Sequence, residues 1–481
     1  MTLRNRFALI AATLGLTMVL VACGGSSLQL SGSPSGTFSN ASLSGAYVFA
    51  INGTNQNGFL TVAGRLQADG NGNITSGTED LNSGSGVFTN LPLNGTYSVG
   101  ADGRGVATLI SSTAVITLDF VLISSQHGLI SRFDNNSSAS GTLDLQSAAT
   151  TSPQGQFAFN LSGIDASGGP VGSVGTISPD GAGNLGAGIQ DINDNGTTNL
   201  NLALSGFYTF NSATGRGTAA LTTSSGTLSF AFYVIDSNHL KLIETDTVPV
   251  LAGDVFRMQP APSNASLAGS YAFTLGGSAG GGPFVAGGVL TADGNGNVTG
   301  GAEDLNSNGT IVQNLATTGN YAIASSGRGT LTLNNSAGAS NFVVYPTTGG
   351  LQMLQTDTTP VSNGVALAQQ GSAFSTATLS GDYGFNLTGV GSGGEIDSIA
   401  KVSAGGNGTL SGAVDFNIVG TLFQGLALNG TYTLAGNGRG TATLRSSSGT
   451  QTLIVYAVSS NRLLFIEVDS NLVATGELDQ Q

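Results

Sequence analysis

Two kinds of ionisable residue recur at fixed positions along this chain of 481 residues. The first is an arginine between two glycines: Arg104, Arg216, Arg328 and Arg439 are separated by 112, 112 and 111 residues on subtraction of their numbers. The second is a pair of aspartates in each repeat, one in an Asp-apolar-Asn triplet and one closing a later apolar run: Asp80 and Asp134, Asp191 and Asp246, Asp304 and Asp357, Asp415 and Asp469. Such residues could support acid–base catalysis, cation binding or the anchoring of a ligand.

Calcium is the cation that an acidic chain rich in Asp and Asn turns would bind. The segment Asp69-x-Asn71-x-Asn73 is similar to the start of an EF-hand loop. However, Ile74 stands where that loop requires glycine, and no glutamate stands at the twelfth position. We therefore interpret the segment as a plain hairpin turn and expect neither a metal nor another cofactor.

Catalytic motifs are equally sparse. His127 and His239 occupy corresponding places in two repeats, but the other repeats have Gly350 and Arg462 there, so we interpret the histidines as turn residues. There is no zinc-ligand spacing or nucleophile elbow, and the glycine-rich segments join strands rather than preceding a helix as phosphate-binding loops do. We expect a protein that is not an enzyme.

The repeats that position these residues are four copies of one domain of about 110 residues. Each contains alternating apolar residues punctuated by Gly, Asn and Asp, which predicts an all-β domain. In the first copy we expect eight strands, over 45–52, 58–68, 73–82, 87–99, 104–111, 115–124, 128–134 and 140–146. The predicted organisation is a signal peptide over 1–22, a lipidated Cys and Gly/Ser tether over 23–39, and β repeats over 40–147, 152–259, 264–370 and 375–481.

Short turns between consecutive strands predict an antiparallel up-and-down meander, which can close into an eight-stranded barrel. An immunoglobulin-like β-sandwich is the alternative. The opening Gly-x-Tyr/Phe-x-Phe followed by a meander loosely resembles lipocalin-like (calycin) barrels, a resemblance that implies a small apolar ligand inside the barrel but no matching ligand-binding residue. The sixth and seventh strands are apolar on both faces, so we expect them to contact the adjacent repeat and form a stiff rod.

The meander also places the recurrent residues at its two ends. At one end we expect each arginine to stack on an aromatic ring as a plug, in the pairs Arg104 with Tyr47, Arg216 with Phe157, Arg328 with Tyr271 and Arg439 with Tyr383. At the other end we expect the eight recurrent aspartates to line a mouth, or to cap turns through Asx hydrogen bonds.

The amino terminus predicts export. Arg4 and Arg6 precede an uncharged stretch over 7–21, which is shorter than the roughly 20 residues that span a bilayer. The stretch ends in Leu20-Val21-Ala22-Cys23, which resembles the lipobox of bacterial lipoproteins, and Cys23 is the only cysteine. The resemblance implies cleavage before Cys23 and attachment of several acyl chains, such as palmitate, to it; Gly24 then implies sorting to the outer membrane. A cleaved secretory signal is the alternative.

The composition restricts the partners. Without Arg4 and Arg6 the mature chain has 11 basic and 27 acidic residues, a net charge of 11 − 27 = −16, which disfavours nucleic acid. We expect a lipid-anchored outer-membrane protein with a structural, adhesion-like or binding role, whose partners are the membrane and an unidentified protein. The alternative is a carrier of small apolar ligands; aromatic residues such as Phe49 and Phe159 would instead fill a small barrel.

Overall fold

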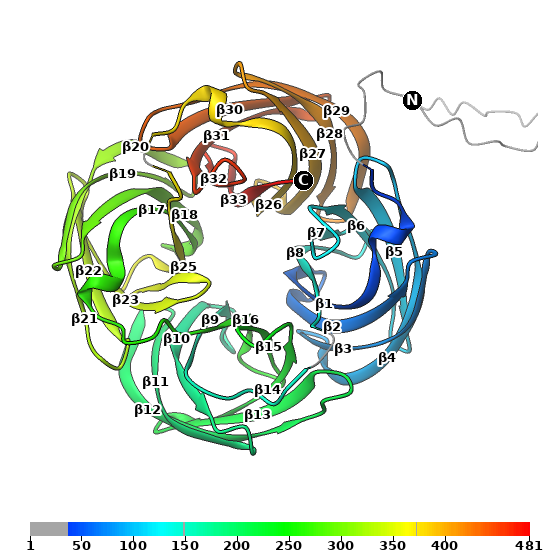
Figure 1. Ribbon diagram of the computed structural model, residues 1–481, viewed down its shortest axis with the longest axis horizontal. Helices are drawn as coiled ribbons and strands as arrows, with labels where there is room; N and C mark the ends of the chain where they lie inside the picture. Colours follow the sequence, from blue (N-terminus) through cyan, green and yellow to red (C-terminus); the bar gives the residue numbers. More distant parts are fainter. Residues whose placement is uncertain (1–36, 148–149, 372) are drawn as a thin grey trace, which may run out of the picture. The chain divides into compact units, whose positions relative to one another are not determined.

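The computed structural model describes residues 37–147, 150–371 and 373–481, so the predicted export signal and Cys23 lie outside the described residues. Residues 35–481 form one compact unit. Within it, the four repeats fold as antiparallel up-and-down barrels in tandem, which Figure 1 shows in four successive colours. The predicted eight-stranded barrel is confirmed, and the sandwich alternative is wrong.

Barrels 1 and 2 each close when their last strand pairs with their first. Barrel 1 contains β1 (Ser44–Asn55), β2 (Gly58–Asp69), β3 (Asn73–Ser83), β4 (Gly86–Val99), β5 (Arg104–Ser111), β6 (Val115–Leu122), β7 (His127–Arg132) and β8 (Ser137–Leu145). Barrel 2 contains β9 (Phe157–Ile164), β10 (Pro170–Pro179), β11 (Asn184–Asp194), β12 (Thr197–Phe210), β13 (Arg216–Thr223), β14 (Gly226–Val234), β15 (His239–Glu244) and β16 (Val250–Arg257).

Barrels 3 and 4 repeat this order, except that the fourth strand of barrel 3 is split in two. Barrel 3 contains β17 (Ala268–Ala279), β18 (Gly282–Asp293), β19 (Asn297–Ser307), β20 (Thr310–Ala316), β21 (Thr318–Ile323), β22 (Gly329–Asn335), β23 (Gly338–Thr347), β24 (Gly350–Gln355) and β25 (Val361–Ala368), and the pairing of β18 with β19 closes it. Barrel 4 contains β26 (Ser380–Gly391), β27 (Gly394–Gly405), β28 (Thr409–Ile418), β29 (Thr421–Leu434), β30 (Arg439–Ser446), β31 (Gly449–Ala457), β32 (Arg462–Glu467) and β33 (Leu472–Gln480).

The first strand of barrel 1 shows why these sequences form barrels. Tyr47, Phe49 and Ile51 alternate along β1 and point into the barrel, where each is at most 1% exposed. Val48, which lies between them on the outer face, is also fully buried because it packs against barrel 2. A strand that is covered on both faces explains the apolar residues that break the simple alternation.

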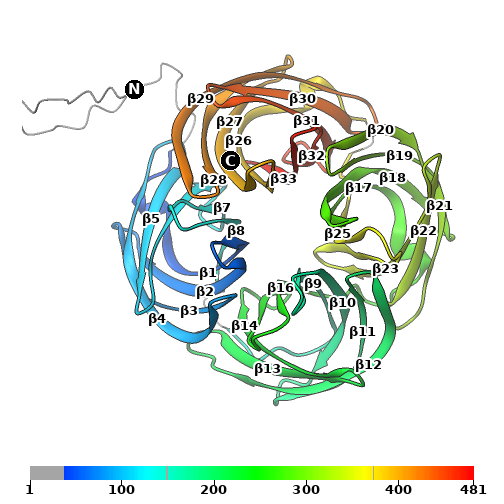
Figure 2. The same cartoon turned by 180° about the vertical axis from the view of Figure 1, so that it is seen from behind.

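The outer contacts join the barrels in cyclic order. One apolar cluster lies at each junction: between barrels 1 and 2, 2 and 3, 3 and 4, and 4 and 1. Seen from both sides, β26–β28 of barrel 4 lie beside β6–β8 of barrel 1 (Figures 1 and 2). The expectation that the doubly apolar strands contact the adjacent repeat is therefore confirmed, but the rod is wrong, because barrel 4 returns to barrel 1 and closes a ring within the unit.

Three short 3-10 helices precede the first strands of barrels 1, 3 and 4: η1 (Asn40–Ser42), η2 (Asn264–Leu267) and η3 (Thr376–Thr378). At the start of each, the hydroxyl oxygen of the third helical residue accepts the backbone N–H of the residue before the helix, as Ser42 Oγ accepts the N–H of Ser39 at 3.1 Å. Among the described residues, none of the helices has the length and apolar character needed to cross a membrane.

Candidate functional site

The arginine of one barrel binds the first aspartate of the preceding barrel. At the junction of barrels 1 and 2, Arg216 donates to Asp80 through Nε at 2.8 Å and Nη2 at 2.6 Å. The hydroxyl of Tyr233, the strand partner of Arg216, donates to the same carboxylate at 2.5 Å. Burial raises the pKa of Tyr233 well above its usual value, so the hydroxyl keeps its proton and donates a hydrogen bond to Asp80.

The same Arg–Asp–Tyr triad recurs at the next two junctions. Arg328 and Tyr345 bind Asp191, with Nη2–Oδ1 and hydroxyl–Oδ2 distances of 2.6 Å. Arg439 and Tyr456 bind Asp304 at 2.5 and 2.9 Å. All three aspartates are fully buried. Each carboxylate also accepts the backbone N–H of a residue with positive φ in the next strand: Asn90, Asn201 and Asn314.

The asparagine of the Asp-apolar-Asn triplet forms a second bridge at every junction. Its amide nitrogen donates to backbone carbonyls at the end of the seventh strand of the following barrel. Asn82 donates to Glu244 and Asp246, and Asn193 donates to Gln355 and Asp357, at 2.8–3.0 Å. Asn306 and Asn417 each donate to two such carbonyls and to that of the first residue of the eighth strand: Glu467, Asp469 and Leu472 for Asn306, and Arg132, Asp134 and Ser137 for Asn417.

A glutamine at or next to the end of each repeat, Gln259 in the second, also bonds the following barrel. Gln146 donates to the carbonyl of Val234 at 2.7 Å, and Gln369 donates to that of Ala457 at 2.7 Å. The last residue, Gln481, donates to the carbonyl of Leu122 at 2.8 Å and so joins the end of barrel 4 to barrel 1. The repeated polar landmarks of the sequence therefore bind one barrel to the next.

The prediction of arginine plugs is wrong. Arg216, Arg328 and Arg439 bind aspartates of the preceding barrel, and Arg104 binds Asp102 of its own barrel, instead of stacking on the aromatic rings. The hydroxyl groups of Tyr47, Tyr271 and Tyr383 instead bond the backbone carbonyls of Ser125, Ser266 and Ser460. Phe157 does carry a guanidinium, but it is that of Arg257, at 4.8 Å from the ring centroid.

A tyrosine on the fourth strand closes this end of the barrel. Tyr97 donates its hydroxyl to the carbonyl of Leu43 at 2.6 Å and thereby holds η1 across the end of barrel 1. The equivalent residues are Tyr208, Tyr321 and Tyr432, which bond the carbonyls of Pro153, Asn264 and Leu379. The sequence reasoning missed them, although Gly-x-Tyr recurs before each Gly-Arg-Gly.

The prediction that the eight aspartates line a mouth is also wrong. Asp80, Asp191 and Asp304 belong to the triads, and Asp415 lies at the fourth junction, where it accepts the N–H of Gly425. The second aspartates hold backbone within their own barrel: Asp134 accepts the N–H of Asn136, as in the Asx alternative, and Asp246, Asp357 and Asp469 accept those of Ser229, Asn341 and Thr452. The structure does not bring the two aspartates of a repeat into a shared site.

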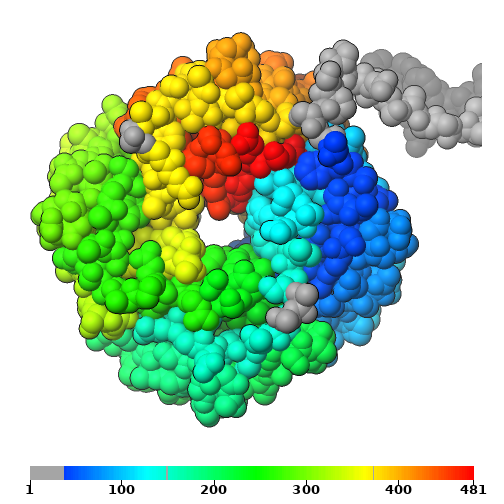
Figure 3. All heavy atoms as spheres, in the orientation of Figure 1, coloured from blue at the N-terminus to red at the C-terminus, as the bar shows by residue number. Residues whose placement is uncertain are grey.

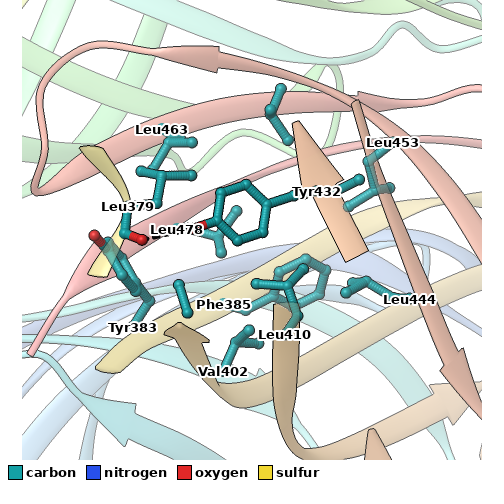
Figure 4. Close-up of a pocket in the computed structure, with 13 residues that line it drawn as sticks. Leu379, Tyr383, Phe385, Val402, Leu410, Tyr432, Leu444, Leu453, Leu463 and Leu478 are labelled. Carbon is teal, nitrogen blue, oxygen red and sulfur yellow. Dashed lines mark hydrogen bonds between the residues drawn. The ribbon is translucent and has the colours of Figure 1, made fainter. Parts of the chain in front are cut away.

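The barrel interiors are filled by their own side chains. Figure 4 shows the cavity inside barrel 4, where Tyr383, Phe385 and Tyr432 converge with leucines from several strands. Its free volume is about 30 Å³, and the corresponding cavity in barrel 2 is also about 30 Å³. That is the share of one water molecule, whereas ligand pockets usually enclose roughly 300–1,000 Å³. The cavities at this end of barrels 2 and 4 leave no room for a ligand.

Larger cavities lie at the other ends of barrels 3 and 4. That of barrel 3 has a volume of about 220 Å³ and is lined by Glu303 and Asn335 among others. That of barrel 4 reaches about 440 Å³, with apolar walls including Phe416 and Leu428 and a polar rim including Arg445 and Gln451. The second cavity is large enough for a small molecule.

A charged cluster lies on the strands that surround the centre of the ring, where the space-filling view shows an opening (Figures 1 and 3). Its members come from the seventh and eighth strands of barrels 1, 2 and 4: His127, Asp144, His239, Lys241, Asp254, Arg462, Glu477 and Asp479. Each carboxylate has a cationic neighbour, for example Lys241 Nζ at 2.6 Å from Asp254 and Arg462 Nη2 at 2.5 Å from Glu477.

The cluster fixes the protonation of its members. Burial lowers the pKa of His127, but hydrogen bonds to Asp144 and Asp479 outweigh burial and raise that pKa to about 9. His127 is therefore a cation at neutral pH, and its Nδ1 donates to Asp144 at 2.7 Å. A histidine that stays protonated and paired is a poor general base. In the described part of the chain, no group of three or more His, Cys, Asp or Glu residues is arranged to hold a metal ion.

No protein-family model and no curated protein sequence matches the chain. Two solved structures of transferrin-binding protein B from Haemophilus parasuis Hp5, a single and a double variant, align with 8% identity over 91% of this chain and over 76% and 75% of theirs, with TM-scores of 0.14 and 0.15. TM-scores this low do not establish a common arrangement of the backbone.

Proposed function

We propose that this protein is a non-enzymatic, lipid-anchored scaffold of the bacterial cell envelope, with a ring of four barrels that presents its loops and central charged surface to a protein partner. The observation that carries the proposal is the use of the repeated polar motifs. Their arginine, asparagine and glutamine side chains bind one barrel to the next. Because these recurrent polar side chains bind the four barrels to one another, they support a structural role for the protein.

Membrane attachment rests on the sequence. The Leu20-Val21-Ala22-Cys23 motif supplies a lipid acceptor, and a Gly- and Ser-rich sequence separates it from the first barrel. Several acyl chains on one cysteine bind a bilayer stably, whereas one chain binds only marginally. We place the protein on the outer membrane because Gly24 follows the cysteine.

The absence of catalysis is inferred from the state of the charged groups. The carboxylates of the central cluster are paired with Lys, Arg or His, and the aspartates of the three triads are saturated with donors. Neither arrangement leaves a carboxylate free to accept a proton from a substrate.

The anchoring is tested by expressing the full chain and its Cys23→Ser variant in a bacterium that processes lipoproteins, with an alkynyl palmitate analogue in the medium. We expect label and membrane fractionation for the parent chain and neither for the variant. Equal labelling of the two chains, or membrane retention of the variant, contradicts the anchor.

A second candidate function is the binding of a small molecule at the open end of barrel 4, which the cavity of about 440 Å³ favours. Native mass spectrometry of the full chain, released from membranes in detergent, separates the two. A scaffold gives the mass of the lipidated chain alone. A carrier gives an additional small mass that Leu428→Trp, which fills the cavity, removes.

A further inference from the structure

The junction between barrels 4 and 1 differs from the other three, which serve as internal controls. Its apolar cluster contains three buried residues, Val121, Leu129 and Ile399, against six, six and eleven at the others. It also lacks the tyrosine of the triad. The strand partner of Arg104 is Val121, where the other barrels have Tyr233, Tyr345 and Tyr456.

The ion pair of this junction is weaker as well. Arg104 binds Asp102 of its own barrel at 2.9 Å, and its Nη1 lies 3.8 Å from Asp415. The Arg104 side chain is 28% exposed, whereas that of Arg216 is 14% exposed. Closing the ring therefore relies on a longer and wetter contact than those within it.

A pair of polar residues replaces an apolar pair at the centre of the junction. Val106, two positions after Arg104, pairs with Asp119 on β6, and Asp119 pairs in turn with Ser131 on β7. The equivalent cross-strand pairs elsewhere are Ala231 with Ile243, Val343 with Leu354, and Ile454 with Ile466. Asp119 is 2% exposed, and within the described residues neither of its carboxylate oxygens has a hydrogen-bond partner.

Barrel 4 contributes a second buried carboxyl group to the junction. Asp397 is fully buried; its Oδ2 accepts the hydroxyl of Ser138 from β8 at 2.7 Å, and its Oδ1 has no partner among the described residues. A buried, unpaired carboxylate costs several kcal/mol in general, a cost that a protonated carboxyl group avoids.

We propose that the junction of barrels 4 and 1 is the point at which the ring opens, and that protonation of Asp119 and Asp397 holds it closed. The ring would then be closed in acid and able to open as the two carboxyl groups lose their protons. The other three junctions, with paired aspartates and apolar cross-strand pairs, stay closed over the same pH range.

The groups that face the two carboxyls support this direction. Two charged side chains interact with Asp119: Arg104 from β5 and Asp415 from β28. Strand β27 carries Asp397 and Lys401 on the same face as Ile399, which packs in the junction. Lys401 is bound by Asp382 at 2.5 Å. On β7 the residue opposite Asp119 is the neutral Ser131, with His127 and Arg132 at the ends of that strand.

Toward Asp397 lie Ser138 and Ser140 from β8, Thr388 from β26, and Glu395 on its own strand. The ionisable group that interacts with Asp397 is therefore another carboxyl, that of Glu395. Neither site has a cation that would compensate fully for ionisation.

The pH window follows from the same surroundings. Burial, and then the charge of Asp415, raises the pKa of Asp119 to about 7, and burial raises that of Asp397 to about 6. An exposed aspartate, as in an opened ring, has a pKa of about 3.9. The closed ring thus binds more protons than the open ring between pH of about 4 and about 7, so closure weakens as the pH rises through this range and changes little from these groups above it.

The test measures the opening of one junction at a time by thiol labelling of the full chain carrying Cys23→Ser. Ser131→Cys places a buried thiol in the junction of barrels 4 and 1. Ala231→Cys places one in the junction of barrels 1 and 2, and it is made together with Glu244→Gln so that the titration of Glu244 does not change the stability of barrel 2. Ala107→Cys, in the core of barrel 1, reports unfolding of that barrel. Each is labelled with 4,4′-dithiodipyridine from pH 4 to pH 8, and its rate is divided by that of free cysteine at the same pH.

We expect the protection of Ser131→Cys to fall at least tenfold between pH 4 and pH 8 while that of the other two stays constant. Adding Asp119→Ala, which copies Ala231, reduces the fall to the part that Asp397 contributes, and adding Val121→Tyr, which copies Tyr233, raises protection at every pH. A constant protection of Ser131→Cys overturns the proposal. So does a parallel loss at Ser131→Cys and Ala107→Cys, because the barrel itself would then be unfolding.

Discussion

Arg216 and Asp80 are 136 positions apart in the chain and belong to different barrels, yet they form a two-pronged ion pair with N–O distances of 2.8 and 2.6 Å. Tyr233 and the N–H of Asn90 supply two more donors to the same carboxylate. A buried carboxylate with four donors has its hydrogen-bonding capacity filled, so its burial between two modules is tolerated and the register of the junction is set.

Removing the arginine should therefore destabilise the ring strongly. Arg216→Ala leaves the buried carboxylate of Asp80 without its counter-charge, and breaking such a pair costs about 3–5 kcal/mol. We expect a loss of that size in the free energy of unfolding, measured by guanidinium titration of the full chain. The direct partner variant, Asp80→Asn, should give a smaller loss because the amide still accepts hydrogen bonds.

The matched control is Arg104→Ala at the fourth junction. Because Arg104 is partly exposed and lies 3.8 Å from Asp415, we expect a loss of about 1 kcal/mol or less. Equal losses for Arg104→Ala and Arg216→Ala would contradict the ranking of the junctions.

The asparagine bridge gives an independent prediction. Asn306→Ala removes a donor shared by three backbone carbonyls of barrel 4, those of Glu467, Asp469 and Leu472. Leaving a buried carbonyl group without a hydrogen-bond donor lowers the free energy of unfolding by about 1–3 kcal/mol. We expect this loss in chemical unfolding, and little change for the control Asn295→Ala, whose side chain lies on an exposed turn. Combining Asn306→Ala with Arg439→Ala should give less than the sum of the two losses, since both act at one junction.

Most strands of the barrel can be predicted from the sequence, because local residue patterns determine where each strand begins and ends. The predicted strand over 104–111 coincides with β5, and the one over 87–99 differs from β4 by one residue. Period-two alternation and the glycines of the turns act within each strand or hairpin, so one repeat contains the information that forms it.

The junctions are not legible in the same way. A repeat identifies Arg216 and Asp80 as recurrent, but it does not say whether an arginine binds the aspartate of its own copy or that of the preceding copy. The closure of the ring depends on the angle between two outer faces of a barrel, and no local pattern encodes that angle. Tyr97 could have been found, because Gly-x-Tyr recurs as regularly as Gly-Arg-Gly.

Tyr97 holds η1 across the end of barrel 1. Tyr97→Phe removes the hydroxyl that bonds the carbonyls of Leu43 at 2.6 Å and Asn40 at 3.0 Å. We expect a loss of about 1–3 kcal/mol in the free energy of unfolding, because the carbonyl of Leu43 is left buried without a donor. Hydrogen exchange should become faster in η1 and stay unchanged in η3 of barrel 4. Unchanged exchange in η1 would show that the tyrosine does not hold the helix.

A buried glutamate makes barrel 2 sensitive to alkali. Burial raises the pKa of Glu244 to about 9, and its Oε1 accepts the N–H of Asp246 at 2.8 Å. An unfolded glutamate titrates near 4.3, so between that pH and about 9 the folded state binds more protons than the unfolded state. The contribution of Glu244 to stability is therefore full in acid and is lost as the pH rises toward about 9.

Glu244→Gln should remove this dependence, and barrel 3 already has the replacement. Gln355 occupies the equivalent position and donates to Asp357 at 2.9 Å. We expect the urea midpoint of Glu244→Gln to exceed that of the parent chain at pH 9 and to approach it at pH 5. The reciprocal variant Gln355→Glu should lower the midpoint at pH 9. Parallel midpoint curves for Glu244→Gln and the parent chain would mean that the carboxyl of Glu244 is not protonated in the fold.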